Sequence, residues 1–166
     1  MDAIRTARLE LRTLRPEDVD AAMKFWGDAE IMKHCGGALD RALIENGIKK
    51  YTNMQNERGF SVFAVTLPGT NDVIGACGFN YTKDDSEVEL IYHFAREYWG
   101  SGYATEAAKA CIQYAKENLP ICKIVASVDP SHESSIKILN KLGFQHAGMK
   151  WFDETQQYDV CFELNI

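Results

Sequence analysis

Long apolar stretches are missing from this sequence of 166 residues. No run reaches the ~18 residues that a membrane-spanning helix requires. The first residues, MDAIRTARLELR, also lack the apolar core of a signal peptide. We therefore expect a cytoplasmic protein that does not enter a membrane.

Cysteine pairs with metal-binding or redox spacing are also missing. The nearest two of the five cysteines, Cys111 and Cys122, lie eleven residues apart, so no C-x-x-C motif exists. No metal site is expected. We expect the thiols to be reduced and mostly buried as small hydrophobic side chains, with a reactive nucleophile as the alternative. The other three are Cys35, Cys77 and Cys161.

Basic clusters longer than a pair of residues are absent as well. The formal net charge is −6 and the isoelectric point is about 5.2. These values argue against nucleic acid as the main ligand, because nucleic-acid binding depends on concentrated positive charge. An acidic surface suits a cationic partner, although an ordinary solvated surface has the same character.

Repeats, low-complexity tracts and linker-like segments are not found, so we predict one domain over residues 1–166. Hydrophobic residues make up 46% and charged residues 25% of the chain, as in soluble globular proteins. A chain of this length buries roughly 70% of the surface of its unfolded form, which is enough for a sizeable core.

The first half of the chain predicts alternating strands and helices. Residues 8–14 alternate apolar and polar side chains like a half-buried strand, and a helix with Pro16 in its first turn follows over 15–28. A weaker helical pattern covers 40–57. Two strands, 60–67 and 73–82, flank the turn PGTND and predict an antiparallel hairpin.

The second half predicts a crossover between two strands. A strand over 86–94 precedes a helix over 102–118, and the apolar run KIVASV at 123–128 is typical of a buried strand. A helix ended by Gly143 and strands over 144–152 and 157–164 complete the chain. This order predicts a mixed α/β domain with a strand–helix–strand crossover at its centre.

The stretch EYWGSGYATEA places two glycines directly before a helix. Glycine lets the backbone approach a ligand, and a helix N-terminus presents unpaired N–H groups. Together they predict an anion site suited to phosphate, with packing of the strand-to-helix turn as the alternative. The phosphate-binding loop of nucleotide hydrolases and the three-glycine dinucleotide motif are both absent.

Three blocks resemble the GNAT superfamily of N-acetyltransferases, specifically its Rim-type branch (RimJ/RimL-like): RTARLELRTLRPEDVDA, EVELIYHFAREYWGSGYATEA and SSIKILNKLGF. The resemblance covers nearly the whole chain. It implies the α/β (α+β) acyl-CoA N-acyltransferase fold, with a mixed, mostly antiparallel central sheet and helices on both faces. It also implies acetyl-CoA as cosubstrate.

The cofactor-binding residues follow from this resemblance. The family motif [Q/R]-x-x-G-x-[G/A] matches at Gly102 and Ala104, while Trp99 replaces the glutamine or arginine. The resemblance implies that backbone N–H groups near the two glycines hold the pyrophosphate and that main chain of the preceding strand pairs with pantetheine. The residues concerned are Tyr92, His93, Phe94, Trp99, Gly100, Ser101, Gly102, Tyr103, Ala104, Thr105 and His132.

Acetyl transfer needs a base for the amine and a hydrogen-bond donor for the leaving thiolate. Glu89 matches the family's glutamate and is the expected base; Glu87, on the same strand face, is the alternative. The thioester carbonyl would be polarised by backbone N–H groups where this strand splays from the strand at 123–128. A structural carboxylate remains the other interpretation of Glu89.

The thiolate side departs from the family pattern. Many members have a tyrosine where this chain has Leu139, so the hydroxyl of Ser135 is the expected donor, with an ordinary helix-start serine as the alternative. His132 replaces the asparagine of the Rim-type motif and contacts the cofactor or begins the helix. These departures leave open a binding module that keeps acetyl-CoA without turnover.

The expected acceptor is a primary amine, most simply a protein N-terminus as in the Rim branch. The alternative is a small molecule such as a polyamine, an amino acid or an antibiotic. Asp159 matches an acidic position of the branch and would bind the acceptor's ammonium; a surface carboxylate is the alternative. Trp26, Trp151 and Tyr158 line the acceptor cleft or belong to the core. A monomer and a homodimer are both compatible with the sequence.

Overall fold

The computed structural model describes residues 2–166, and in them one eight-stranded sheet has the order β1-β2-β3-β4-β5-β6-β8-β7. The β5–β6 pair is parallel and the other six strand pairs are antiparallel, which confirms the mostly antiparallel mixed sheet. The strands are β1 (Ile4–Arg5), β2 (Glu10–Thr13), β3 (Val62–Thr66), β4 (Val73–Tyr81), β5 (Glu87–Phe94), β6 (Lys123–Val128), β7 (Gln145–Phe152) and β8 (Gln157–Asn165).

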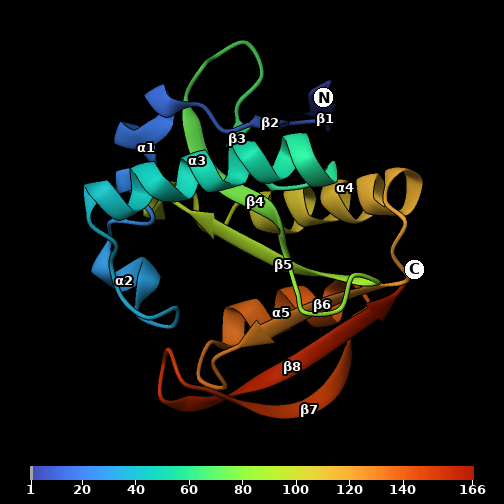
Figure 1. The fold of residues 1–166 in the computed structure, drawn as a ribbon. Helices are drawn as coiled ribbons and strands as arrows, with labels where there is room; N and C mark the ends of the chain where they lie inside the picture. The colour runs from blue at the N-terminus through green and yellow to red at the C-terminus, as the bar shows by residue number, and fades with distance from the viewer. Residues whose placement is uncertain (1) are drawn as a thin grey trace.

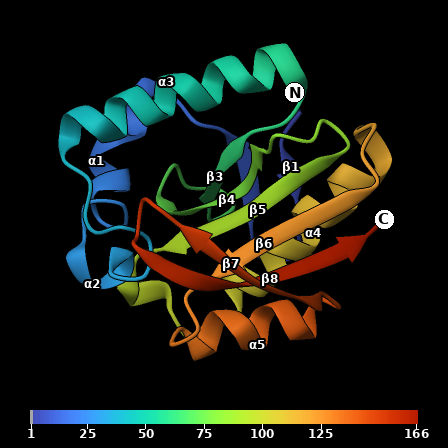
Figure 2. The ribbon, with the colours of Figure 1, turned by 60° about the horizontal axis from the view of Figure 1, so that its bottom comes forward.

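Helices cover both faces of the sheet, as expected (Figures 1 and 2). One hydrophobic cluster joins the sheet to α1 and α3, and a second joins it to α4 and α5. The α-helices are α1 (Val19–Met23), α2 (Ala29–Met32), α3 (Arg41–Arg58), α4 (Tyr103–Asn118) and α5 (Glu133–Lys141); short 3-10 helices are η1 (Pro16–Asp18) and η2 (Arg96–Tyr98). No helix in residues 2–166 is both long and apolar enough to cross a membrane.

Local signals set the ends of two helices. The Asp40 carboxylate accepts a 2.9 Å hydrogen bond from the Leu43 backbone N–H and caps the start of α3, which ends at Gly59 in the left-handed conformation. Gly143 follows α5 with a φ of 89° and stops it as predicted. The central β5–α4–β6 crossover is also confirmed, because β5 and β6 pair in parallel.

The region between β2 and β3 differs from the prediction. The single helix expected over 15–28 is divided into η1 and α1, and a separate short helix, α2, begins at Ala29. Its N-cap is Asp28, whose side chain accepts from the Glu30 and Ile31 N–H groups. Strand β1 was also not expected. Strand β1 has two residues and helix α2 has four, which is too short to show a hydrophobic periodicity in the sequence. Tertiary contacts therefore determine whether such short elements form.

The prediction that the cysteines are mostly buried is wrong. Cys77 and Cys111 are buried, with their sulfur atoms 3.8 Å apart, but Cys35 and Cys122 are exposed and Cys161 is half-buried. All five are free thiols. The two buried residues lie where β4 packs against α4 in the core, whereas the exposed ones lie in connecting segments outside the sheet.

A buried ion pair ties β2 to the turn that begins the α1 region. Arg12 donates to both carboxylate oxygens of Asp18, at 2.8 and 2.9 Å, and Asp18 also accepts from the Arg15 backbone N–H at 2.8 Å. The side chains of Arg12 and Asp18 are 11% and 5% exposed. The proximity of Asp18 raises the pKa of Arg12, so the pair stays ionised.

We expect Asp18→Asn to lower the free energy of unfolding by about 3 kcal/mol, because it leaves the Arg12 charge buried without a partner. Urea unfolding measures the change. Asp20→Asn is the matched control, since Asp20 pairs with Arg41 on the surface, where its side chain is 83% exposed. Equal shifts of the urea midpoint in the two variants would contradict the assignment of stability to the buried pair.

Candidate active site

The parallel strands β5 and β6 part soon after they meet. Their residue pairs are Glu87–Lys123, Val88–Ile124 and Glu89–Val125, and no later pair forms between them. Both strands nevertheless continue, β5 to Phe94 in register with β4 and β6 to Val128 in register with β8. Figure 1 shows their arrowheads pointing apart. The splay expected between these strands is therefore present, and it begins at Glu89.

A cavity of about 560 Å³ lies at this opening. Both strands line it, as do the α1–α3 region, α5 and the β7–β8 turn. Of the residues expected from the sequence, its walls contain Glu89, Tyr92, His93, His132, Ser135, Leu139, Trp26 and Asp159. The turn residues 99–105 and Phe94 are not among its lining. Trp151 and Tyr158 also lie elsewhere: they are 44% and 58% exposed and pack edge-on against each other.

Glu89 and Glu87 have different surroundings. Glu89 is half-buried in the cavity wall, and burial raises the pKa of its carboxyl, while Lys150 and Lys50 oppose the shift. Glu87 is not part of the wall, and its carboxylate is 4.0 Å from the Lys123 ammonium. Of the two acids on this strand face, only Glu89 therefore lines the cavity.

Tyr92 and Ser135 meet across the opening. The Tyr92 hydroxyl lies 2.7 Å from Ser135 Oγ, and burial raises the pKa of Tyr92 to about 12. Leu139, one helical turn beyond Ser135, is fully buried. Side chains alternate along a strand, so Tyr92 lies on the opposite face of β5 from Glu89. Accordingly, Tyr92 packs against the α4–α5 cluster, and Ile91, on the Glu89 face, packs against the α1–α3 cluster.

His132 lies at the start of α5 but does not cap the helix with its side chain. Its ring stacks on His34, with ring centroids 4.6 Å apart, and His34 Nδ1 is 2.9 Å from an Asp129 oxygen. Burial and the neighbouring His34 lower the pKa of His132. The pair therefore joins the α2–α3 loop to the β6–α5 turn at the cavity rim.

His93 was expected to act through its main chain, and its side chain has a role of its own in the wall. Trp26 Nε1 donates to His93 Nδ1 at 3.1 Å, and burial lowers the pKa of His93 to about 4. Because Trp26 only donates, the neutral ring carries its proton on Nε2, which is 3.4 Å from Cys35 Sγ. Although Cys35 is exposed as a whole residue, desolvation of its thiol raises the pKa to about 11, which disfavours a nucleophilic thiolate.

Acidic groups gather in the cavity wall. Among the described residues that line it, four are carboxylic acids and none is lysine or arginine. Asp159 is 8% exposed and its Oδ1 accepts from Gln157 Nε2 at 2.7 Å. Asn80 Oδ1 and Thr155 Oγ1 are buried in the same wall without a hydrogen-bond partner. The acids are Glu89, Asp129, Glu154 and Asp159.

The glycine turn at residues 100–102 has a backbone geometry suited to binding an anion at the start of α4. Gly100 and Gly102 have φ angles of 78° and 80°, in the left-handed region that favours glycine, and Gly102 is the N-cap residue of α4. A Cβ atom at Gly100 would meet no atom within 4 Å, so open space lies beside the backbone there. These features fit an anionic group at the helix start. Trp99, the first residue of the motif, donates from Nε1 to the Phe94 carbonyl at 2.8 Å.

Arg8 fixes this turn and was not predicted as a site residue. Its Nη1 donates to the Ser101 carbonyl at 2.8 Å and its Nε donates to Glu106 at 2.7 Å. Its guanidinium also lies 4.7 Å from the centre of the Tyr103 ring. Arg8 stands 93 residues from Ser101 and 98 from Glu106, and a single sequence carries no signal for such a contact. A positive charge is thereby held beside the proposed phosphate site.

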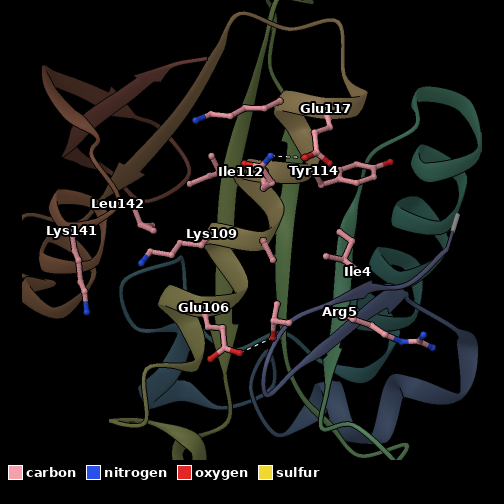
Figure 3. Close-up of a pocket in the computed structure, with 13 residues that line it drawn as sticks. Ile4, Arg5, Glu106, Lys109, Ile112, Tyr114, Glu117, Lys141 and Leu142 are labelled. Atoms are coloured by element: carbon pink, nitrogen blue, oxygen red, sulfur yellow. Dashed lines mark hydrogen bonds between the residues drawn. The ribbon is translucent and has the colours of Figure 1, made fainter.

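A second hollow, of about 700 Å³, lies on the outer side of α4. Figure 3 shows Lys109 on α4 and Lys141 at the end of α5 on one side of it, and Ile4 on the other. Glu106, at its lower edge in this view, accepts a hydrogen bond from Thr6. No residue lines both hollows, so this hollow is separate from the cavity at the strand opening.

A mixed sheet opened at a parallel strand pair, next to a glycine turn at a helix start, defines the class of acyl-CoA-dependent N-acyltransferases. The sequence profile described as the acetyltransferase (GNAT) domain matches residues 8–145. The chain therefore belongs to the GNAT acetyltransferase family, and it is an acetyl-CoA-dependent acetyltransferase. The expected acetyl-CoA is the cosubstrate of this family.

Two relatives show how similar the chain is to known sequences. An uncharacterized N-acetyltransferase, p20, of Bacillus licheniformis is 33% identical over 152 residues, or 90% of this chain and 85% of the relative. The spermidine N(1)-acetyltransferase of Escherichia coli is 29% identical over 143 residues, or 84% and 74%.

Solved structures show the same fold at low identity. A GNAT-family acetyltransferase from Bacillus anthracis has a TM-score of 0.87 at 23% identity and covers 99% of this chain and 98% of its own. The ribosomal L7/L12 acetyltransferase RimL in complex with coenzyme A has a TM-score of 0.83 at 13% identity, with coverage of 99% and 98%. At these identities, membership of the Rim branch is not established.

We expect Gly102→Val to weaken acetyl-CoA binding at least about tenfold, because a β-branched residue resists the left-handed conformation that aims the turn's N–H groups. Its Cβ would also approach within 3.4 Å of Arg8 Nη2. Calorimetric titration with acetyl-CoA measures the affinity. Gly59→Val is the matched control, since Gly59 has a φ of 76° at the end of α3, far from the turn in the sequence. Normal affinity in a folded Gly102→Val protein would contradict the assignment of the glycine turn as the pyrophosphate-binding site.

Proposed function

We propose that the protein transfers the acetyl group of acetyl-CoA to a neutral primary amine by direct attack in a ternary complex, with Glu89 as the general base. The observation that carries this proposal is the position of Glu89 at the last β5–β6 pair, where the strands part and the cavity begins. Its raised pKa supports the role, because a base works best when its pKa is near the operating pH.

Acetyl-CoA would lie along the open edge of β5. Beyond Glu89 this edge has no partner strand, so main-chain groups of Leu90–His93 are available to an extended pantetheine chain, as in strand addition. The glycine turn would hold the pyrophosphate through backbone N–H groups. This arrangement would place the thioester in the gap between the strands.

The amine and the leaving sulfur would then lie on opposite faces of β5. The neutral amine would approach on the Glu89 face and form the C–N bond with the thioester carbonyl carbon, giving a tetrahedral intermediate whose nitrogen then passes one proton to Glu89. Backbone N–H groups of Ala126–Val128, on the facing edge of β6, would stabilise the carbonyl oxygen. The C–S bond would break toward the other face of β5, where Ser135 lies.

We expect Glu89→Gln to lower turnover at neutral pH about a hundredfold or more, while acetyl-CoA affinity stays within twofold. In the unaltered protein, the rate should rise with pH through the raised pKa of Glu89, because only the carboxylate accepts the proton; the variant should lack this rise. Above that pKa the buried charge costs stability, so the amide should keep or raise the melting temperature.

Release of free coenzyme A, followed with a thiol reagent across pH, measures these rates. Glu87→Gln is the control, since Glu87 lies on the same strand face outside the cavity wall. An unchanged pH–rate profile in Glu89→Gln would remove Glu89 from the mechanism, and loss in Glu87→Gln alone would transfer the role to Glu87.

For the acceptor we propose a small polyamine. Four carboxylic acids in the wall, without a lining lysine or arginine among the described residues, favour a ligand with more than one positive charge. The unpartnered oxygens of Asn80 and Thr155 favour a ligand rich in N–H donors. Similarity to a spermidine acetyltransferase agrees with this class.

A protein N-terminal amine, as in the Rim branch, is the second candidate. Cys35 and Glu154 line the cavity and are exposed, so an acceptor attached to a longer chain has a route to it. The fold shared with RimL is compatible with this acceptor. The two candidates differ in the number of charges that the wall must bind.

We expect Asp159→Asn to raise the KM for spermidine about tenfold and to change the KM for a monoamine of similar length much less, because the buried carboxylate would bind the second ammonium. Initial rates with spermidine, nonylamine and a short peptide with a free N-terminus test this. Higher activity toward the peptide than toward spermidine would favour the protein acceptor instead.

A further inference from the structure

Five hydroxyl-bearing side chains line the cavity, and two of them are bonded to each other across the strand opening. Tyr92 Oη and Ser135 Oγ are 2.7 Å apart, although the residues are separated by 43 positions in the chain. The other three hydroxyls belong to Tyr51, Ser127 and Thr155. Within the described residues, Tyr92 is the hydrogen-bond partner of Ser135 Oγ, so this serine is not engaged by the backbone of its own helix.

We propose that Tyr92 is a positioning residue for the thiolate-binding serine: it donates its hydroxyl hydrogen to Ser135 Oγ and so directs the Ser135 hydrogen toward the sulfur of acetyl-CoA. The proposal rests on the acetyl transfer proposed above. It assigns to the Tyr92 side chain a task beyond the cofactor contact through its main chain.

The direction of the hydrogen bond follows from acidity. A phenol is a stronger acid than an aliphatic alcohol, so Tyr92 is the better donor of the two and Ser135 the better acceptor. A serine hydroxyl that accepts a hydrogen bond becomes a stronger donor itself, because hydrogen bonds in a chain polarise one another. The Tyr92 hydroxyl also lies 3.4 Å from the Ser135 carbonyl, a length too great for a strong O–H···O bond.

The Tyr92–Ser135 hydrogen bond compensates for Leu139, which stands one turn later on α5 where many family members have a tyrosine hydroxyl. Ser135 and Leu139 are four residues apart and lie on one face of the helix, and both line the cavity. Leu139 offers no donor. The phenol of Tyr92 is present in the same wall, but it belongs to β5 and would act on the sulfur indirectly, through its hydrogen bond to Ser135.

No proton leaves the hydroxyl pair during the reaction. As the intermediate collapses, the C–S bond breaks, its electron pair stays on sulfur, and the nitrogen proton goes to Glu89. The thiol of coenzyme A resembles a cysteine thiol, with a pKa of about 8.5. Burial raises the pKa of Tyr92 to about 12, so the thiolate is too weak a base to deprotonate the phenol. The two hydroxyls therefore stabilise the thiolate by hydrogen bonding, and solvent protonates it after release.

The test compares Tyr92→Phe, Ser135→Ala and the double variant. We expect Tyr92→Phe to lower kcat about tenfold, with the KM for acetyl-CoA within twofold, because one hydrogen bond to a charged group is weakened. Ser135→Ala should lose at least as much. In the Ser135→Ala background, Tyr92→Phe should cost nothing further, since Tyr92 acts through Ser135.

A second readout separates positioning from structural support. Coenzyme A bound to the protein is titrated by ultraviolet absorbance of its thiolate; the thiol pKa should be higher in Tyr92→Phe and in Ser135→Ala than in the unaltered protein. Tyr114→Phe is the matched control: the Tyr114 hydroxyl donates to the Gly59 carbonyl at 2.6 Å, outside the cavity. This variant should lose stability but keep kcat and the bound thiol pKa.

Tyr92→Phe with unchanged kcat and unchanged bound thiol pKa would overturn the inference, as would additive losses in the double variant. If Tyr92→Phe does not fold, 3-fluorotyrosine at position 92 preserves the shape with a more acidic phenol and should lower the bound thiol pKa; no change would likewise overturn it. Failure of the unaltered protein to bind coenzyme A would instead reject the proposed binding mode.

Discussion

The parting of β5 and β6 after three residue pairs is the constraint on which the rest of the site depends. Each strand stays paired with its other neighbour to its end, so the divergence leaves main-chain groups on two facing edges. Backbone N–H and C=O groups away from water need partners. In the proposed binding mode, the extended pantetheine chain would supply partners to the edge of β5. The cavity, the open edge of β5 and the position of Glu89 all follow from this divergence.

The divergence also separates the chemical roles by strand face. Alternation along β5 directs Glu89 toward the α1–α3 side and Tyr92 toward the α4–α5 side. The proposed base and the residue proposed to position the thiolate-binding serine therefore lie on opposite faces of one strand. Burial raises the pKa of both side chains, which suits a carboxylate that accepts a proton and a phenol that keeps one.

Local patterns predicted the regular elements and the glycine turn. Gly143 and the PGTND hairpin act within a few residues, so they are visible in the sequence. The division of the first helix, the short elements β1 and α2, and the exposure of Cys35 and Cys122 depend on distant contacts. The contacts of Arg8 were not predicted for the same reason: its partners Ser101 and Glu106 are 93 and 98 residues away in the chain.

The sequence by itself determined the order of most strands and helices and the glycine turn, because these depend on neighbouring residues, and its resemblance to the GNAT family implied acetyl-CoA and the set of candidate residues. Only the tertiary structure decided which candidates share a cavity. It separated Glu89 from Glu87, joined Tyr92 to Ser135, and placed Trp26 inside and Trp151 outside. These distinctions depend on how far two strands diverge and on which faces the helices cover, and such long-range geometry has no signature in a single chain of residues.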